Sequence, residues 1–278
     1  MRLTRRGRLT VTVTLVIVLL ATGGWLVVER TPVGTLLGLG DGPPCTLATG
    51  SDELSWTSAE AMTATTVAGV GTRIGATENG IAAAVERALV GEPESAISPQ
   101  AARTVYRLLP DVAQSDARSR AVARALLGGR ASALTCVTRL DDGDLAFEET
   151  GSLGLTPRAD AVRLAMRTVF GKQVLGGFEA GGVSAGHVEG SAHYEGRAVD
   201  VFFRPVSAEN TAAGWQTALW LVAHAEQLRV ATVIFDREIW SSERSVQGWR
   251  TYRYPGGDTD NPVLLHEDHV HVDVPRGS

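Results

Sequence analysis

The sequence has little lysine, few cysteines and no cluster of basic residues that could bind a polyanion. Of its 26 basic residues only Lys172 is a lysine, and beyond residue 8 the arginines are scattered along a chain with a formal net charge of −5. Nucleic acid is therefore excluded as a partner, because such proteins carry a basic patch. The two cysteines are too few for a zinc ribbon. The chain is nevertheless 44% hydrophobic, which is enough for a folded core.

The N-terminus contains one long uncharged run. Four arginines in the first eight residues precede residues 9–28, which carry no charge, and Glu29 and Arg30 follow. At about 1.5 Å per residue this run covers the ~30 Å hydrocarbon core of a bilayer. Residues 1–30 are therefore predicted to be a single-pass membrane anchor that leaves the rest of the chain outside the cytoplasm. A cleaved signal peptide is the alternative, although its apolar region is usually only about 7 to 15 residues long.

Cys45 and Cys136 are expected to form a disulfide, because both readings of the N-terminus export the chain and an even pair in an exported protein is most simply a bridge. On the chain-entropy model, closing a loop of this length stabilises the fold by roughly 4 kcal/mol. A lipid-modified Cys45 is the competing idea. The preceding Gly-Pro-Pro lacks the small and aliphatic residues that such a site requires.

The remaining chain divides by composition. A Gly- and Pro-rich linker, residues 31–44, precedes Ala-rich segments of helical period that predict a small all-α domain over residues 45–138. Thr57 and Glu60 form a capping-box pattern at its first helix. An acidic linker, residues 139–153, leads to a domain over residues 154–278 in which helices and strands interleave irregularly. The expected fold class is α+β, with the anchor and the helical domain in front.

Most of the histidines gather in two places. His193 precedes the strand-like segment AVDVFF, in which Asp200 is a lone carboxylate among apolar residues. Because a buried unpaired carboxylate is costly, coordination to a cation is one way to offset its burial. Gly196 lets the loop turn so that His193 can lie beside Asp200, and Ala198 leaves room.

The second cluster is the C-terminal segment DHVHVDV. In a strand its alternation places His269, His271 and Asp273 on one face. His193, Asp200 and His271 then supply two imidazoles and a carboxylate, the ligand set of a catalytic zinc with one open position. Asp268 and His269 remain alternative candidates for the general base.

These two segments also carry a family resemblance. The first matches the pattern S-x-H-x-x-G-x-A-x-D through Ser191, His193, Gly196, Ala198 and Asp200. The DHVH of residues 268–271 matches the second motif of the same group. The chain thus resembles the zinc-dependent D-alanyl-D-alanine carboxypeptidases and peptidoglycan endopeptidases, which share a fold with the Hedgehog signalling domain. Residues 154–275 look most like an actinobacterial extracellular C-terminal domain, and the likeness covers under half the chain.

The resemblance implies zinc on His193, Asp200 and His271. It also places Asp268 where many relatives have the catalytic acid and His269 where the endopeptidase branch has a second active-site histidine. Ser191 would brace the ligand loop.

One departure from the family pattern concerns the substrate. Relatives usually carry an arginine that grips the substrate's carboxylate, and here Glu179 follows Phe178 at that place. Either another arginine, such as Arg237 or Arg250, replaces that arginine, or the substrate differs. Trp249 and its neighbouring aromatics either line a substrate groove or pin down a loop.

The sequence thus predicts a cell-envelope zinc peptidase that acts on peptidoglycan stem peptides. Its alternatives are a zinc-stabilised module that binds cell-wall peptide without cutting it, and a structural domain without zinc.

Overall fold

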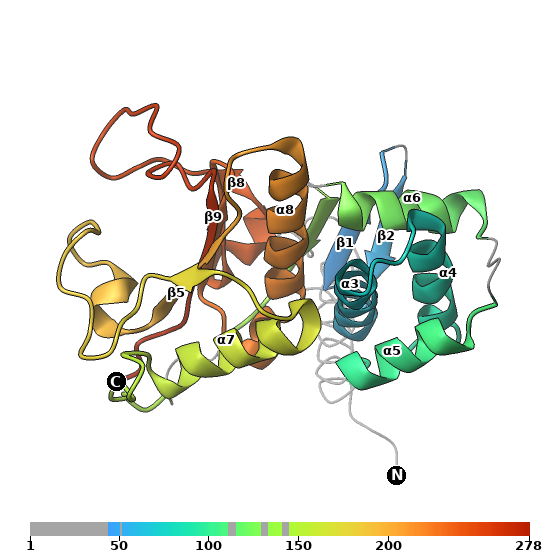
Figure 1. Cartoon of the computed structure of the whole chain (residues 1–278), viewed down its shortest axis with the longest axis horizontal. Helices are drawn as coiled ribbons and strands as arrows, with labels where there is room; N and C mark the ends of the chain where they lie inside the picture. Colours follow the sequence, from blue (N-terminus) through green and yellow to red (C-terminus); the bar gives the residue numbers. More distant parts are fainter. Residues whose placement is uncertain (1–43, 51, 111–114, 129–132, 141–144) are drawn as a thin grey trace, which may run out of the picture. The chain divides into compact units, whose positions relative to one another are not determined.

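A small antiparallel sheet opens the described part of the chain. A computed structural model describes residues 44–50, 52–110, 115–128, 133–140 and 145–278 (Figure 1). Strands β1 (Cys45–Ala48), β2 (Glu53–Trp56) and β3 (Leu134–Cys136) pair in the order β2-β1-β3. Cys45 lies directly opposite Cys136, and the predicted disulfide joins them. The expectation of an all-α domain is therefore wrong. The sequence pattern did not reveal these strands because three or four residues are too few to show a period of two.

Four helices follow β2 before β3 closes the small sheet. They are α3 (Ser58–Arg73), α4 (Glu78–Leu89), α5 (Pro99–Leu108) and α6 (Ala117–Leu127). The predicted capping box at the start of α3 is confirmed: the Glu60 amide donates to Thr57 Oγ1 at 3.2 Å, and the Thr57 amide donates to Glu60 Oε2 at 2.7 Å. Helix α3 is rich in buried small residues, which let neighbouring helices approach closely.

A six-stranded antiparallel sheet forms the C-terminal part, in the order β4-β5-β9-β6-β7-β8. Its strands are β4 (Leu175–Gly176), β5 (Ala198–Phe202), β6 (Thr232–Phe235), β7 (Glu238–Ser241), β8 (Arg250–Thr251) and β9 (His269–Asp273). Helices α7 (Pro157–Phe170), α8 (Ala208–Ala223) and α9 (Ala225–Leu228) accompany it. The α+β part of the expected fold class is confirmed.

Helix α8 covers the apolar face of this sheet. Its Gly214 lies against Phe235 of β6, where an added Cβ would come within 2.1 Å of the ring. On its other side α8 contacts α3, and Trp220 Nε1 donates to Thr66 Oγ1 at 3.1 Å. Figure 1 shows α8 between the large sheet and α3. From Gly214 onward nearly every residue of the helix is buried, and the described part of residues 44–278 forms one compact unit around a shared core.

The transmembrane helix in the expected fold class has no support and is corrected. None of the helices in the described ranges is long and apolar enough to cross a membrane. The segment predicted as the anchor, residues 1–30, lies outside the described residues.

Candidate metal centre

Asp200 and His271 face each other across two central strands. They are directly paired in the antiparallel ladder between β5 and β9, so their side chains lie on the same face of the sheet. The alternating valines Val199 and Val270 belong to the core on the opposite face. Strand pairing therefore sets two residues of the predicted ligand group side by side.

His193 reaches the same place from a 3-10 helix, η2 (Ala192–Glu195), just before β5. Ser191 caps this turn by accepting from the His193 amide at 3.4 Å, and Gly196 ends it in the left-handed conformation with φ 64°. A Cβ at Gly196 would come within 2.3 Å of the Gly154 carbonyl oxygen. The loop therefore depends on a glycine at this position to return His193 to Asp200.

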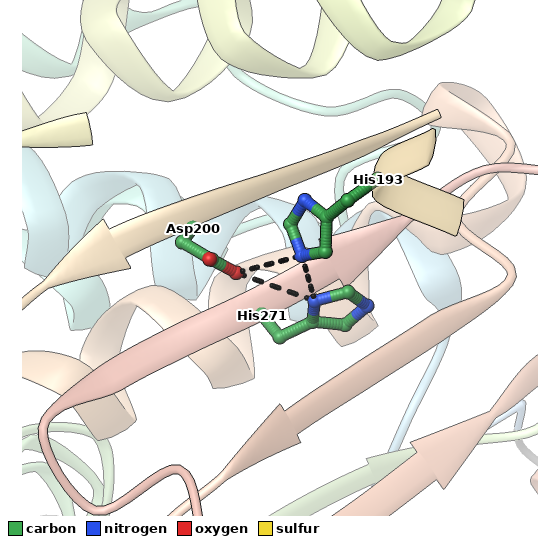
Figure 2. A group of neighbouring side chains, drawn as sticks. All are labelled: His193, Asp200 and His271. Carbon is green, nitrogen blue, oxygen red and sulfur yellow. Dashed lines mark hydrogen bonds and ion pairs between the residues drawn. The ribbon is translucent and has the colours of Figure 1, made fainter. Parts of the chain in front are cut away.

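Three side-chain atoms converge between these elements (Figure 2). His193 Nε2 lies 3.0 Å from His271 Nδ1, and Asp200 Oδ1 lies 3.3 Å from each of those nitrogens. Ligands bonded to a tetrahedral zinc at about 2.0 to 2.2 Å lie about 3.3 to 3.6 Å apart, because the edge of a tetrahedron is about 1.6 bond lengths. The triangle is close to that size, and all three residues are buried. The cluster can therefore hold a metal ion.

The outer hydrogen bonds of the two histidines direct their lone pairs into this triangle. His193 Nδ1 donates to the Gly177 carbonyl oxygen at 2.7 Å, since a carbonyl can only accept. His271 Nε2 donates to Asp273 Oδ2 at 3.2 Å. When both rings are neutral, these contacts leave both inner nitrogens as acceptors, as is the Asp200 carboxylate. Three acceptors that face one another then need a proton or a metal ion between them.

The electrostatics of the cluster show the same demand for positive charge. Burial opposes ionisation of Asp200, but hydrogen bonds from His193 and His271 outweigh it and hold the pKa of Asp200 well below its usual range. Burial also disfavours charge on His271, yet hydrogen bonds to Asp200 and Asp273 raise the pKa of His271 to about 9. Either a proton or a metal ion must balance the buried carboxylate.

A cavity of about 710 Å³ opens beside the cluster. Its wall includes the three cluster residues, together with Gly177 and His269. Two stretches poor in regular structure, around residues 186–192 and 252–266, supply much of the rest. The cluster therefore has one side on which a small molecule can approach.

His269 lines the cavity beside the cluster. Its Nδ1 bonds Asp268 Oδ1 at 2.7 Å, and its Nε2 lies 3.9 Å from Asp200 Oδ1. Asp268 is buried and is not among the described cavity-lining residues, and its second oxygen accepts from Arg204 Nε at 2.6 Å. Asp268 therefore orients His269, and the imidazole is the group that reaches the cavity.

The structure places the three predicted substrate-binding residues elsewhere, since none is among the described residues that line the cavity. Trp249 donates from Nε1 to the Leu134 carbonyl oxygen at 3.0 Å and packs edge-on against Trp215, so it holds a loop in place. Arg237 pairs with Glu267. Arg250 donates to Ser241 and to the Arg244 backbone. The structure therefore does not bring these three residues to the cavity wall, and each has its partners elsewhere.

Glu179 is exposed and likewise absent from the described cavity wall. The arginines that do line the cavity are Arg197 and Arg204, both of which follow η2 closely in sequence. Neither was predicted from the sequence.

Two further histidines of the wall were also missed. The ring of His187 stacks on His193 with centroids 3.9 Å apart, and that of His266 lies 4.6 Å from His269. His266 has a positive φ of 56°, a conformation rare outside glycine. The only available signal was that His187 and His266 stand close in sequence to the two motifs.

Comparison with known proteins gives one result. Residues 151–263 match the family model described as VldE, C-terminal domain. The match includes His193 and Asp200, ends before His271 and covers less than half of the 278 residues. No curated protein and no solved structure matches the chain.

Proposed function

We propose that the chain is a zinc metallopeptidase that hydrolyses amide bonds in peptidoglycan stem peptides, with a C-terminal region of the Hedgehog and D-alanyl-D-alanine peptidase superfamily. The observation that carries the proposal is the convergence of His193, Asp200 and His271 beside an open cavity. Two imidazoles and one carboxylate suit zinc, and catalytic zinc sites have three protein ligands and one open position. The outward hydrogen bonds to Gly177 and Asp273 are the supporting contacts that such ligands usually make.

When bound, zinc supplies Lewis acidity that polarises a substrate carbonyl and makes water more acidic. The chain's own residues handle the proton. His269 Nε2 is the free acceptor beside the cluster, and the Asp268 carboxylate fixes its tautomer and stabilises the ring when it gains a proton. Of the two alternatives for the general base, we therefore propose His269, with Asp268 as the residue that positions it.

The disulfide of the chain agrees with a substrate that lies outside the cytoplasm. The disulfide between Cys45 and Cys136 is expected to persist only in an oxidising compartment, and peptidoglycan lies outside the cytoplasm. The cavity is large enough for part of a peptide rather than a single small ion.

The test uses the purified full-length chain with stem peptides that end in D-alanyl-D-alanine and with cross-linked muropeptides. We expect new amine termini by mass spectrometry, lost with chelator and restored by zinc. Asp268→Asn should retain zinc and lower kcat by about 10² to 10⁴-fold, while the exposed Asp258→Asn serves as the matched control. Stoichiometric zinc without any cleavage would favour the binding module, and a chain that takes up no zinc would exclude both.

A further inference from the structure

Arg204 lies at the cavity wall, where its guanidinium is held by two contacts while its two terminal nitrogens have no partner among the described residues. Its guanidinium carbon lies 4.1 Å from the centroid of the Phe202 ring, and its Nε donates to the buried Asp268 carboxylate. The side chain is nevertheless 51% exposed. Stacking and the ion pair together fix the plane of the guanidinium, so little conformational freedom remains to be lost on binding.

The two terminal nitrogens of Arg204 have no hydrogen-bond partner among the residues that the structure describes. A guanidinium presents two parallel donor edges, one that includes Nε and one formed by the two Nη groups. Asp268 takes up Nε, so the Nη edge is left. That edge has the geometry to receive both oxygens of a carboxylate.

The other arginine of the cavity wall does not offer the same opportunity. Arg197 Nε pairs with Glu195 at 2.6 Å, and its Nη1 donates to the Val274 carbonyl oxygen at 2.6 Å. Its side chain is only 17% exposed. Arg204 is therefore the cavity arginine, among the described lining residues, that can bind an anionic group.

We propose that Arg204 binds a carboxylate of the substrate through its Nη edge, which makes the preferred substrates peptides with a free carboxylate close to the cleaved amide. This inference rests on the proposed function of the site and names its substrate class. It gives the site an anchor at a residue outside both metal motifs. Because Arg204 also holds Asp268, and Asp268 holds His269, the anchor and the base share one hydrogen-bonded chain. A bound carboxylate therefore has a fixed position relative to His269.

The test measures binding apart from turnover, with N-acetyl-D-alanine and its uncharged carboxamide as probes. Calorimetric titration is carried out on the full-length chain with zinc and again in chelator, where coordination to the metal cannot cause a preference for the acid. We expect the wild-type chain to bind the acid about tenfold or more tightly than the amide in both conditions. Arg204→Gln should bring that ratio close to one. Arg237→Gln, an arginine outside the cavity, should leave it unchanged.

Arg204→Lys separates charge from geometry and guards against a misfolded glutamine variant. Lysine keeps the charge but not the planar fork, so the preference for the acid should fall without disappearing. A wild-type chain without preference, or an Arg204→Gln chain that keeps it, overturns the proposal. If the preference depends on Arg204 but no stem peptide is cut, the carboxylate site stands and the peptidase fails. If stem peptides are cut at the same rate with or without Arg204 and with or without a free carboxylate, the peptidase stands and the carboxylate site fails.

Discussion

Two buried histidine clusters in this molecule differ in one respect, the balance of donors and acceptors. In the first, which we call the α8 cluster, His224 Nδ1 donates to the Trp220 carbonyl oxygen at 2.9 Å and Nε2 accepts from Thr66 Oγ1 at 3.3 Å. Trp220 Nε1 in turn donates to Thr66. Each donor meets an acceptor, and burial lowers the pKa of His224 to about 4. A neutral ring completes this cluster without any ion.

The metal cluster of His193, Asp200 and His271 is equally buried but has no such balance. Its donors are used outward, on Gly177 and Asp273, and its acceptors meet in the centre. Burial alone therefore does not distinguish a structural histidine from a metal ligand. The direction in which the lone pair points does, and it can be read from the partner of the other ring nitrogen.

The strongest challenge to this comparison is to remove one histidine from each cluster. His193→Ala should eliminate stoichiometric zinc, about one per chain in the wild type, and all zinc-dependent activity, because two remaining ligands hold zinc poorly. His224→Gln should keep the zinc and instead lower the free energy of unfolding by about 1 to 3 kcal/mol, as it disturbs a buried hydrogen-bonded group. Elemental analysis of the dialysed protein and urea denaturation measure the two effects. The comparison fails if His224→Gln also loses the metal.

Much of the metal cluster was predictable because its geometry follows from strand periodicity. Alternation in residues 198–203 and 268–274 places Asp200 and His271 on the faces opposite to the neighbouring valines, and an antiparallel ladder then pairs them. The composition of the loop before β5 also indicated that His193 could return to them. The alternation of side chains along a strand depends only on residues that are adjacent in the sequence, so it can be predicted without knowledge of distant contacts.

What could not be predicted depends on contacts between distant segments. Trp249 has the composition of a binding residue, yet its partner is Leu134, more than a hundred residues earlier. Arg204 follows β5 without any periodic signal, and its role depends on Asp268 across the sheet. The small sheet escaped notice because β3 has only three residues and pairs with β1 far upstream.

A smaller effect is expected from the residue that fixes the outward hydrogen bond of His193. An added Cβ at Gly177 would lie 2.3 Å from His193 Cε1 and 2.8 Å from Asp200 Oδ2, at a φ of 77°. Gly177→Ala should therefore displace the imidazole and weaken zinc affinity by about 10- to 100-fold, the usual cost of losing a supporting contact. Competition with a chromophoric chelator measures the affinity.

Gly181→Ala is the matched control for that substitution. Gly181 also has a positive φ, of 91°, but nothing lies within 4 Å of its added Cβ. Both variants carry the backbone strain of an L-residue in this region, so the difference between them isolates the collision with His193. Equal affinities in the two variants would show that the Gly177 contact does not position the ligand.

The smallest effect distinguishes the two clusters by their response to acid. The folded-state pKa of His224, lowered to about 4 by burial, lies below its ordinary value of 6.5, so the unfolded chain binds a proton more readily. Its contribution to stability is thus complete above about pH 6.5 and is lost as the pH falls toward 4. Between about pH 7 and 5.5 this loss amounts to about 1 kcal/mol.

Urea denaturation at pH 7 and at pH 5.5 should show this loss in the free energy of unfolding of the wild-type chain, and not in that of His224→Gln, whose amide does not titrate. Parallel pH profiles of the two proteins would mean that His224 is not held neutral by its partners, and the contrast between a self-sufficient cluster and one that requires a cation would be lost.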